Sequence, residues 1–246
     1  MKKQTLILAT LFVITVFISC SKEITKQDEP QAEEFATSRS GDTRGGSTNS
    51  LSKGLLGLYE FNGSLIEKTG KLATAQTSNE GPATYTVDRK GFRGRAVKFT
   101  GAYALDLGYV PHSAKMSLAV WVKYDDALAK PSNFIHSQSD GPRVQQVADA
   151  YYGYNNPSGP PYIASSPINN DWHFLALTLD GTTIRFYVDG NFAGSAISPD
   201  VENIASAIYT LGYGNIAGTY WLGAIDDLRL YGRTLSSSEV LALYSL

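Results

Sequence analysis

The sequence predicts an all-β protein in which two antiparallel sheets pack on each other and one short C-terminal helix closes the chain. Three observations support this fold class. The 246 residues include 15 Tyr and 23 Gly, a composition typical of strands and turns. Short runs in which apolar and polar residues alternate recur along the chain, as in half-buried strands. Two Asp-Gly pairs, Asp180-Gly181 and Asp189-Gly190, separate such runs and indicate tight hairpins.

The alternating runs give the strands that we expect, and these lie at 57–63, 84–88, 95–101, 103–107, 117–123, 133–137, 162–164, 172–179, 183–188, 192–196, 208–213 and 221–231. We expect 103–107 to pair with 95–101 as a hairpin. Ser236 and Glu239 form a capping box before apolar residues at helical spacing, which predicts the helix. Residues 125–170 are rich in Gly, Pro, Asn, Ser and Tyr and predict long loops, where binding residues often lie.

The overall charge and the cysteine count exclude several functions. The formal net charge is -2 and no basic block is present, so a dedicated nucleic-acid binder is excluded. The chain has one cysteine, so it can form neither an intrachain disulfide nor a thiolate metal cluster.

Residues 1–19 are interpreted as a targeting segment. Lys2 and Lys3 form a basic start, and the apolar run that follows is too short for a transmembrane helix. The segment ends in Phe17-Ile18-Ser19-Cys20, which resembles a bacterial lipobox. The resemblance implies that Cys20 becomes the lipidated first residue of the mature protein. The alternative is an ordinary secretory signal followed by a chance cysteine.

Residues 20–53 are interpreted as the lipidated cysteine and a flexible tether, and residues 54–246 as the folded domain. The tether is rich in Ser, Thr, Gly, Glu, Lys and Gln, and Phe35 is its one aromatic residue. Such a segment buries too little apolar surface to offset its chain entropy. We therefore expect a protein of the cell envelope that is attached to the outer membrane by its lipid alone. If the lipid lies in the outer leaflet, the domain is exposed at the cell surface.

The strand 223–231 carries two adjacent acids. Strict alternation places Asp226 on the face of Leu228 and Asp227 on the opposite face. One acid therefore points toward an apolar layer, where an unpaired charge is costly. It needs a cation, a backbone donor or a metal as a partner.

The order of the strands resembles a known family. Six pieces carry the resemblance, in the order LYEFNGS, VKFTG, SLAVWVK, WHFLALTLDG, IRFYVDG and GAIDDLRLYGRTLSSSEVLALY. In this order they resemble the laminin-G-like, type 3, branch of the concanavalin A-like lectin/glucanase superfamily. The resemblance implies a jelly-roll sandwich that binds carbohydrate or protein on an extracellular protein. The chain, with its lipobox-like segment and tether, also resembles lipoproteins of Bacteroidetes-type bacteria.

The resemblance further implies a structural Ca²⁺. In related sandwiches the ligands are an aspartate of the last strand and main-chain carbonyls of two earlier segments, and these positions correspond to Asp226, Glu60 and Gly101. Calcium accepts several oxygen ligands in flexible geometry. The alternative is that Asp226 caps backbone amides or pairs with an arginine such as Arg95 or Arg229.

The carboxylate pattern argues against catalysis. Glucanases of this fold need two carboxylates at a defined separation, and those of glycoside hydrolase family 16 take them from a Glu-x-Asp-x-x-Glu strand. This spacing is absent, and the glutamates of the domain are isolated from one another. We therefore expect a non-enzymatic domain, with an atypical glycoside hydrolase as the remaining catalytic alternative.

A carbohydrate site is expected to combine aromatic faces with planar polar groups. The residues that offer these groups are Tyr151, Tyr152, Tyr154, Asn155, His136, Arg143 and Trp221. The alternative for the tyrosines is a loop that packs on itself. We expect a monomer, and two functions are possible for it. One is the capture of glycans, and the other is protein binding in adhesion or assembly. An open aromatic groove would favour the first and a flat apolar patch the second.

Overall fold

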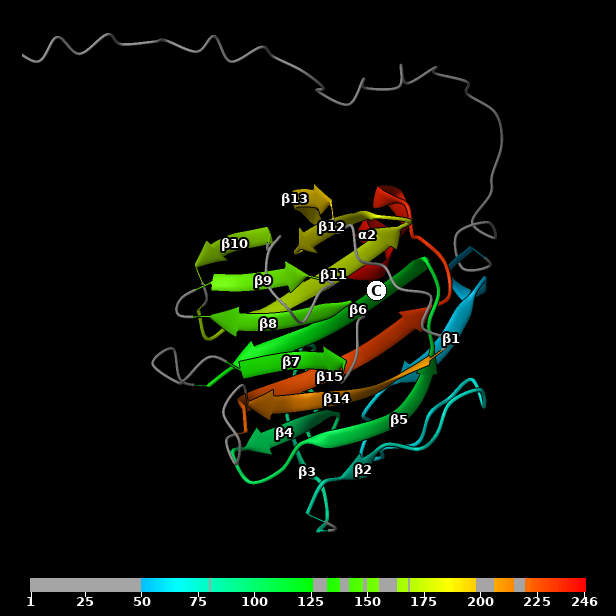
Figure 1. Ribbon diagram of the computed structural model, residues 1–246. Coiled ribbons are helices and arrows are strands. Elements are labelled where there is room, and N and C mark those ends of the chain that lie inside the picture. The colour runs from blue at the N-terminus through cyan, green and yellow to red at the C-terminus, as the bar shows by residue number, and fades with distance from the viewer. Residues whose placement is uncertain are drawn as a thin grey trace, which may run out of the picture. The chain divides into compact units, whose positions relative to one another are not determined.

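The computed structural model describes residues 50–79, 81–125, 132–137, 142–147, 150–154, 163–167, 169–197, 206–214 and 220–246. These residues form two antiparallel sheets packed face to face (Figure 1). One short helix, α2 (Ser237–Tyr244), follows the last strand. The predicted all-β sandwich with a C-terminal helix is confirmed. Among the described residues, no helix is long and apolar enough to cross a membrane.

The first sheet has eight strands. Its order is β13 (Asn191–Ile197), β12 (Thr183–Val188), β11 (Trp172–Asp180), β6 (Lys115–Tyr124), β15 (Leu222–Tyr231), β4 (Ala96–Thr100) and β3 (Thr84–Thr86), with β1 (Leu55–Tyr59) also paired to β15. The two Asp-Gly turns join β11 to β12 and β12 to β13, as predicted.

The second sheet has seven strands. Its order is β10 (Ile163–Pro167), β9 (Ala150–Tyr154), β8 (Arg143–Val147), β7 (Ser132–Ser137), β14 (Ser206–Gly214), β5 (Leu105–Pro111) and β2 (Gln76–Thr77). The predicted hairpin between 95–101 and 103–107 is wrong, because β4 and β5 belong to different sheets. The chain crosses between the sheets at Gly101–Ala104, so that β4 pairs with β15 while β5 pairs with β14.

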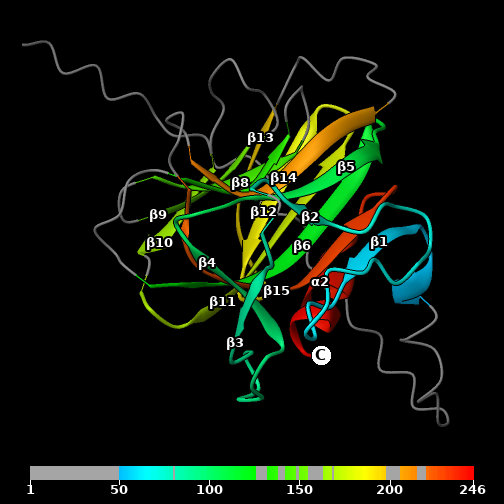
Figure 2. The same ribbon diagram turned by 90° about the horizontal axis from the view of Figure 1, so that it is seen from below.

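The main core lies between the two sheets, and strand β6 shows how alternation builds it. Leu118, Val120 and Val122 face this core. Ala119 and Trp121 face the other side of the first sheet. There they meet α2, which covers the outer face of that sheet (Figure 2). The apolar side of the short helix is thereby buried. A helix of this length is not stable in isolation and depends on such packing.

An arginine–glutamate pair fixes α2 to the start of the domain. The hydroxyl of Ser236 accepts the Glu239 N–H at 3.2 Å, and the Glu239 carboxylate accepts the Ser236 N–H at 3.0 Å, so the predicted capping box is confirmed. Arg233 donates to both carboxylate oxygens of Glu239 and to the carbonyls of Ser50 and Lys53. Leu51 is buried in the outer cluster. The packed domain therefore includes Ser50–Lys53, which the predicted boundary at residue 54 assigned to the tether.

Replacing Glu239 with Gln is expected to destabilise the domain by about 1–3 kcal/mol, because Arg233 then loses its charged partner. The Arg233 hydrogen bonds lower the pKa of Glu239 to about 2. Since this folded-state pKa is depressed, the stabilisation is present above the ordinary pKa of 4.5 and is lost as the pH falls toward 2. Urea unfolding at pH 7 and at pH 3 measures both effects.

The matched control for this variant is Asp180→Asn, which removes the exposed pair with Lys115. It should change stability by at most about 0.5 kcal/mol. Equal losses in the two variants would contradict a special role for Glu239.

Candidate functional site

The two adjacent acids of β15 lie at a β-bulge. Asp226 is opposite Trp121 on β6 while Arg229 is opposite Ala119, so two residues of β15 face the single residue between them. Asp227 has φ 45°, the left-handed conformation that aspartate tolerates better than most residues. A bulge interrupts the alternation of side chains. The prediction that the two acids point to opposite faces is therefore wrong.

Both acids bind one guanidinium. Arg89 Nη1 lies 2.8 Å from Asp226 Oδ2 and 2.6 Å from Asp227 Oδ2. The Arg89 side chain is 9% exposed and the Asp226 side chain 4%. The guanidinium also lies over the Trp121 ring, 5.0 Å from its centroid. Asp226 thus pairs with an arginine, as one alternative foresaw, but with Arg89 rather than Arg95 or Arg229. We call Arg89, Asp226 and Asp227 the arginine clasp.

The loop between β3 and β4 places Arg89 at the clasp. The Asp88 carboxylate accepts the N–H groups of Lys90 at 2.9 Å and Phe92 at 2.7 Å, which closes a turn around Arg89. The Asp88 N–H in turn donates to the Phe92 carbonyl at 3.0 Å. A loop held in this way can present a buried guanidinium to two strands distant in sequence.

The electrostatics of the clasp are unbalanced, because one guanidinium serves two carboxylates. Burial raises the pKa of Asp226 to about 7, and the nearby charge of Asp227 acts in the same direction. Arg89 opposes this rise. Asp226 therefore gains a proton in the neutral range, well above the ordinary pKa of 3.8. The clasp carries its excess negative charge only above that range.

Of the three residues predicted to hold Ca²⁺, Asp226 and Glu60 line one cleft and Gly101 lies apart from them. Gly101 follows Thr100, which is opposite Leu222, and Asp226 lies four residues further along β15, roughly 13 Å away. The Asp226 carboxylate is also occupied by Arg89. In the part of the chain that the structure describes, no group of three or more His, Cys, Asp or Glu could hold a metal ion. Asp226, Glu60 and Gly101 thus do not fit a shared calcium ion.

A cleft of about 350 Å³ opens beside the arginine clasp. Its other walls include Glu60 and Asn62 after β1, Arg95 before β4, and Arg229 on β15. We call it the acid–arginine cleft. Arg95 lies over the Phe92 ring at 4.8 Å. Within the described ranges, no ion pair joins Arg95 or Arg229 to a carboxylate.

The acid–arginine cleft offers planar donors and acceptors. Carboxylates accept hydrogen bonds through two oxygens, the Asn62 amide both donates and accepts, and guanidinium groups donate in a fixed fork. Such groups can bind adjacent hydroxyls of a sugar, which also donate and accept. The cleft lies at the small end of the volume range of ligand pockets, roughly 300–1,000 Å³.

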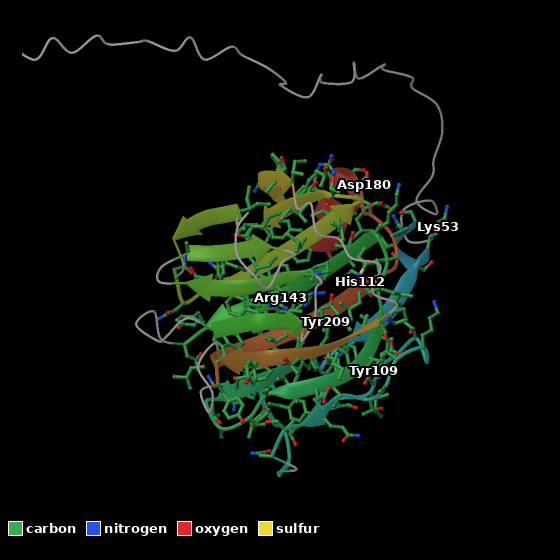
Figure 3. All side chains as sticks on the ribbon, viewed as in Figure 1. Lys53, Tyr109, His112, Arg143, Asp180 and Tyr209 are labelled. Atoms are coloured by element: carbon green, nitrogen blue, oxygen red, sulfur yellow. The ribbon has the colours of Figure 1, made fainter. Side chains whose placement is uncertain are left out.

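Three predicted ligand residues are buried, and two of them belong to the main core. Tyr151 and Trp221 are each 1% exposed and belong to the main core. Their rings pack against Phe134, at 5.6 Å and 4.8 Å between centroids. Arg143 on β8 is 5% exposed (Figure 3). For Tyr151 and Trp221 the prediction of exposed ligand contacts is wrong, because both side chains lie in the core between the two sheets. The neighbouring Val144 faces that core, so alternation directs Arg143 to the other face of the second sheet, and its binding role stays a prediction.

The remaining predicted ligand residues are not tested. His136 and the tyrosines 152 and 154 lie on β7 and β9, but their side chains are outside the described part of the structure. Asn155 also lies outside the described residues. For these four residues a binding role stays a prediction.

The sequence did not point to two residues, the buried Arg89 and the exposed Tyr109. Arg89 carried no signal except its place in the turn Asp88-Arg89-Lys90-Gly91. Tyr109 on β5 is 70% exposed (Figure 3). The strand was expected to end at Leu107, whereas it continues to Pro111 with a bulge at Gly108, whose φ is 70°. Period-two extension from Leu105 and Leu107 would have placed Tyr109 on the buried face, so only the bulge at Gly108 explains its exposure.

Together, the two antiparallel sheets and the polar cleft define a lectin-like jelly-roll domain. The sequence profile of the Laminin_G_3 family, described as the concanavalin A-like lectin/glucanases superfamily, matches residues 96–241. The match covers more than half of the chain, and the chain belongs to this family. The chain is also similar to usherin from Mus musculus, with 26% identity over 148 residues. The alignment covers 54% of this chain and 3% of usherin, so the chain spans a small part of that relative.

Solved structures share the fold. Domain 4 of AbnA, a GH43 extracellular arabinanase from Geobacillus stearothermophilus solved with arabinotriose, is similar at a TM-score of 0.64 and 23% identity, over 77% of this chain and 98% of that one. A structure of botulinum neurotoxin type C, whose cell entry depends on interaction with two ganglioside molecules, is similar at a TM-score of 0.65 and 13% identity. The match covers 80% of this chain and 52% of that one. The binding domain of botulinum neurotoxin DC, in complex with rat synaptotagmin II, is similar at a TM-score of 0.60 and 13% identity. The match covers 78% of this chain and 51% of that one. At these identities the likeness establishes the fold alone.

Proposed function

We propose that this protein is a lipoprotein of the bacterial cell envelope, anchored in the outer membrane through Cys20, and that its sandwich domain binds oligo- or polysaccharide at the cell surface without catalysis. The lipobox-like end of the targeting segment supports the anchor. The lectin-like fold and the neighbours that bind arabinotriose and gangliosides support a glycan ligand.

The acid–arginine cleft is the observation that carries the proposal. Asn62, Arg95 and Arg229 line it. Within the described residues neither Arg95 nor Arg229 forms an ion pair with a carboxylate, although Arg229 hydrogen bonds to Tyr231. Asp227 supplies an acceptor that the Arg89 guanidinium holds in place at 2.6 Å. Fixed donors and acceptors of this kind select ligands by the direction of their hydroxyls.

The arginine clasp also supports a role without catalysis. The Asp226 side chain is 4% exposed and bound to Arg89, so it is poorly placed to approach a glycosidic bond. Glycosidases need one acid and one base or nucleophile on opposite sides of that bond. Two carboxylates joined by one guanidinium do not offer this arrangement.

Glycan-array binding by the domain, compared among single variants, tests the proposal. Arg95→Ala and Asn62→Ala should each weaken binding of a captured glycan about tenfold or more, because each removes a hydrogen-bonding group from the cleft. Lys115→Ala removes an exposed cation at the far end of β6 and should leave binding unchanged. Loss on Tyr109→Ala with intact binding in the cleft variants would place the glycan on the second sheet instead.

A protein-binding role is the second candidate. The exposed apolar residues Phe192, Leu241 and Tyr244 lie close together, since Leu241 and Tyr244 adjoin Gly190 and Phe192 contacts Tyr187. A grouped apolar surface of this kind favours a protein partner. Absence of binding to every glycan on the array would favour this role over the first.

A further inference from the structure

His173 lies at the start of β11, at the edge of the main core. It is opposite Val122 of β6, whose side chain faces that core. Its ring packs against the Tyr151 ring, with 5.6 Å between centroids. Nδ1 lies 2.8 Å from Asp189 Oδ2, and Nε2 lies 2.9 Å from Asn169 Oδ1. Both ring nitrogens therefore face an oxygen.

The hydrogen bonds around Asn169 fix which of its side-chain atoms faces the ring. The Asp171 N–H donates to Asn169 Oδ1 at 2.7 Å. Only the oxygen of the amide can accept this hydrogen bond, so the atom facing Nε2 is an acceptor. The Asp189 carboxylate is also an acceptor. Each ring nitrogen must then donate, and an imidazole that donates from both nitrogens is protonated.

Asp189 is held rigidly in its role as partner. Its Oδ1 accepts the Phe174 N–H at 2.9 Å, and its own N–H donates to the Phe174 carbonyl at 2.8 Å. Its φ of 51° belongs to the tight turn with Gly190 between β12 and β13. His173 thus joins two turns, 169–171 and 189–190, to the start of β11.

The charged and titratable groups around His173 act mostly in one direction. Asp189 raises the pKa of His173 through its hydrogen bond and its charge, Asp171 adds a smaller contribution, and burial opposes them. Tyr151 on β9 and Tyr124 on β6 present phenols on the core side, and burial raises the pKa of Tyr151. Lys123, next to Val122 on β6, points to the opposite face of the sheet by strand alternation.

We propose that His173 is a protonated clamp that fastens the turn 169–171 to the turn 189–190 and releases Asn169 when the pH rises. Loss of the Nε2 proton leaves a nitrogen lone pair facing an oxygen, which removes the hydrogen bond and adds repulsion. Because the folded-state pKa is raised, the stabilisation is complete below the ordinary pKa of 6.5 and is lost as the pH rises through the folded value. The end of the sandwich that carries these turns then loosens under alkaline conditions.

NMR titration of the His173 ring in the intact domain tests the clamp, with His173→Gln to assign its signals. The wild-type midpoint should lie above 6.5, with both ring nitrogens protonated at pH 6. Asp189→Asn keeps a residue that tolerates the left-handed turn, and it should lower the midpoint below the wild-type value. Asn169→Ala should lower it less.

Amide exchange supplies a second measurement on the same samples. After correction for the intrinsic effect of pH, exchange at the Asp171 N–H should increase about tenfold once His173 is neutral. The increase should be absent in Asn169→Ala, where this bond is already lost. A midpoint at or below 6.5, a neutral single tautomer at pH 6, or a midpoint unchanged by Asp189→Asn would each overturn the clamp.

Discussion

Arg89→Ala is expected to destabilise the domain by about 3–5 kcal/mol at pH 8. The change leaves the 4% exposed Asp226 side chain and its neighbour Asp227 without their shared cation, and breaking a buried pair from one side is far more costly than its net stabilisation. Loss of the contact with the Trp121 ring adds to the effect. Chemical denaturation at fixed pH measures the change.

The pH dependence of this loss provides an internal control. The raised pKa of Asp226, about 7 in the wild type, rises further without Arg89. The carboxyl is then neutral at pH 5, so the loss should be smaller there than at pH 8. Asp226→Asn placed in the Arg89→Ala background should recover part of the stability. An equal loss at both pH values would contradict a cost that arises from a buried charge.

Calcium provides a separate test of the same residues. Because Asp226 is bound to Arg89 and Gly101 lies at the other end of β4, the domain should melt at the same temperature in calcium and in chelator. A calcium-dependent rise in Tm that disappears in Asp226→Asn would contradict this expectation.

Trp221→Ala is expected to cost about 3–5 kcal/mol, the range for removing a large aromatic side chain from a core. Its ring contacts Phe99, Tyr124 and Phe134, and the side chain is 1% exposed. Urea unfolding measures the loss. In the same preparation, glycan binding by the folded fraction should be unchanged, because the indole does not reach the surface.

The matched control is Trp221→Phe, which keeps most of the aromatic volume and should cost less than about 1.5 kcal/mol. In the described part of the chain the indole N–H has no hydrogen-bond partner, so phenylalanine breaks no such bond. Tyr109→Ala removes an aromatic ring that is 70% exposed and should be nearly neutral. A small loss in Trp221→Ala together with weaker glycan binding would return this residue to the ligand site.

Local sequence signals predicted much of the fold. The alternating run 117–123 became β6, and the two Asp-Gly turns became the hairpins of β11, β12 and β13. These features depend on residues within a few positions of one another. Pairing across the sandwich does not, which is why the hairpin expected between 95–101 and 103–107 was wrong.

The site was less predictable for physical reasons. Arg89 and Asp226 are 137 residues apart in sequence, and no local pattern joins them. The bulge at Asp227 involves a left-handed backbone angle that the sequence does not reveal. The prediction that Asp226 and Asp227 lie on opposite faces assumed an uninterrupted strand. Tyr151 was assigned to a loop from composition, although tyrosine also favours strands. Its burial followed from the first sheet, which only the tertiary fold brings over it.

The central claim is that the acid–arginine cleft binds a glycan. It is tested most directly by mapping the chemical-shift changes of the domain when an oligosaccharide selected on the glycan array is added. Arabinotriose serves as the first probe because a similar domain was solved with it. If the acid–arginine cleft binds the sugar, the largest shifts will occur at Asn62, Arg95 and Arg229, and Arg95→Ala will abolish them. Shifts confined to Tyr109 and its neighbours on the second sheet, with the cleft unaffected, would contradict the proposed site.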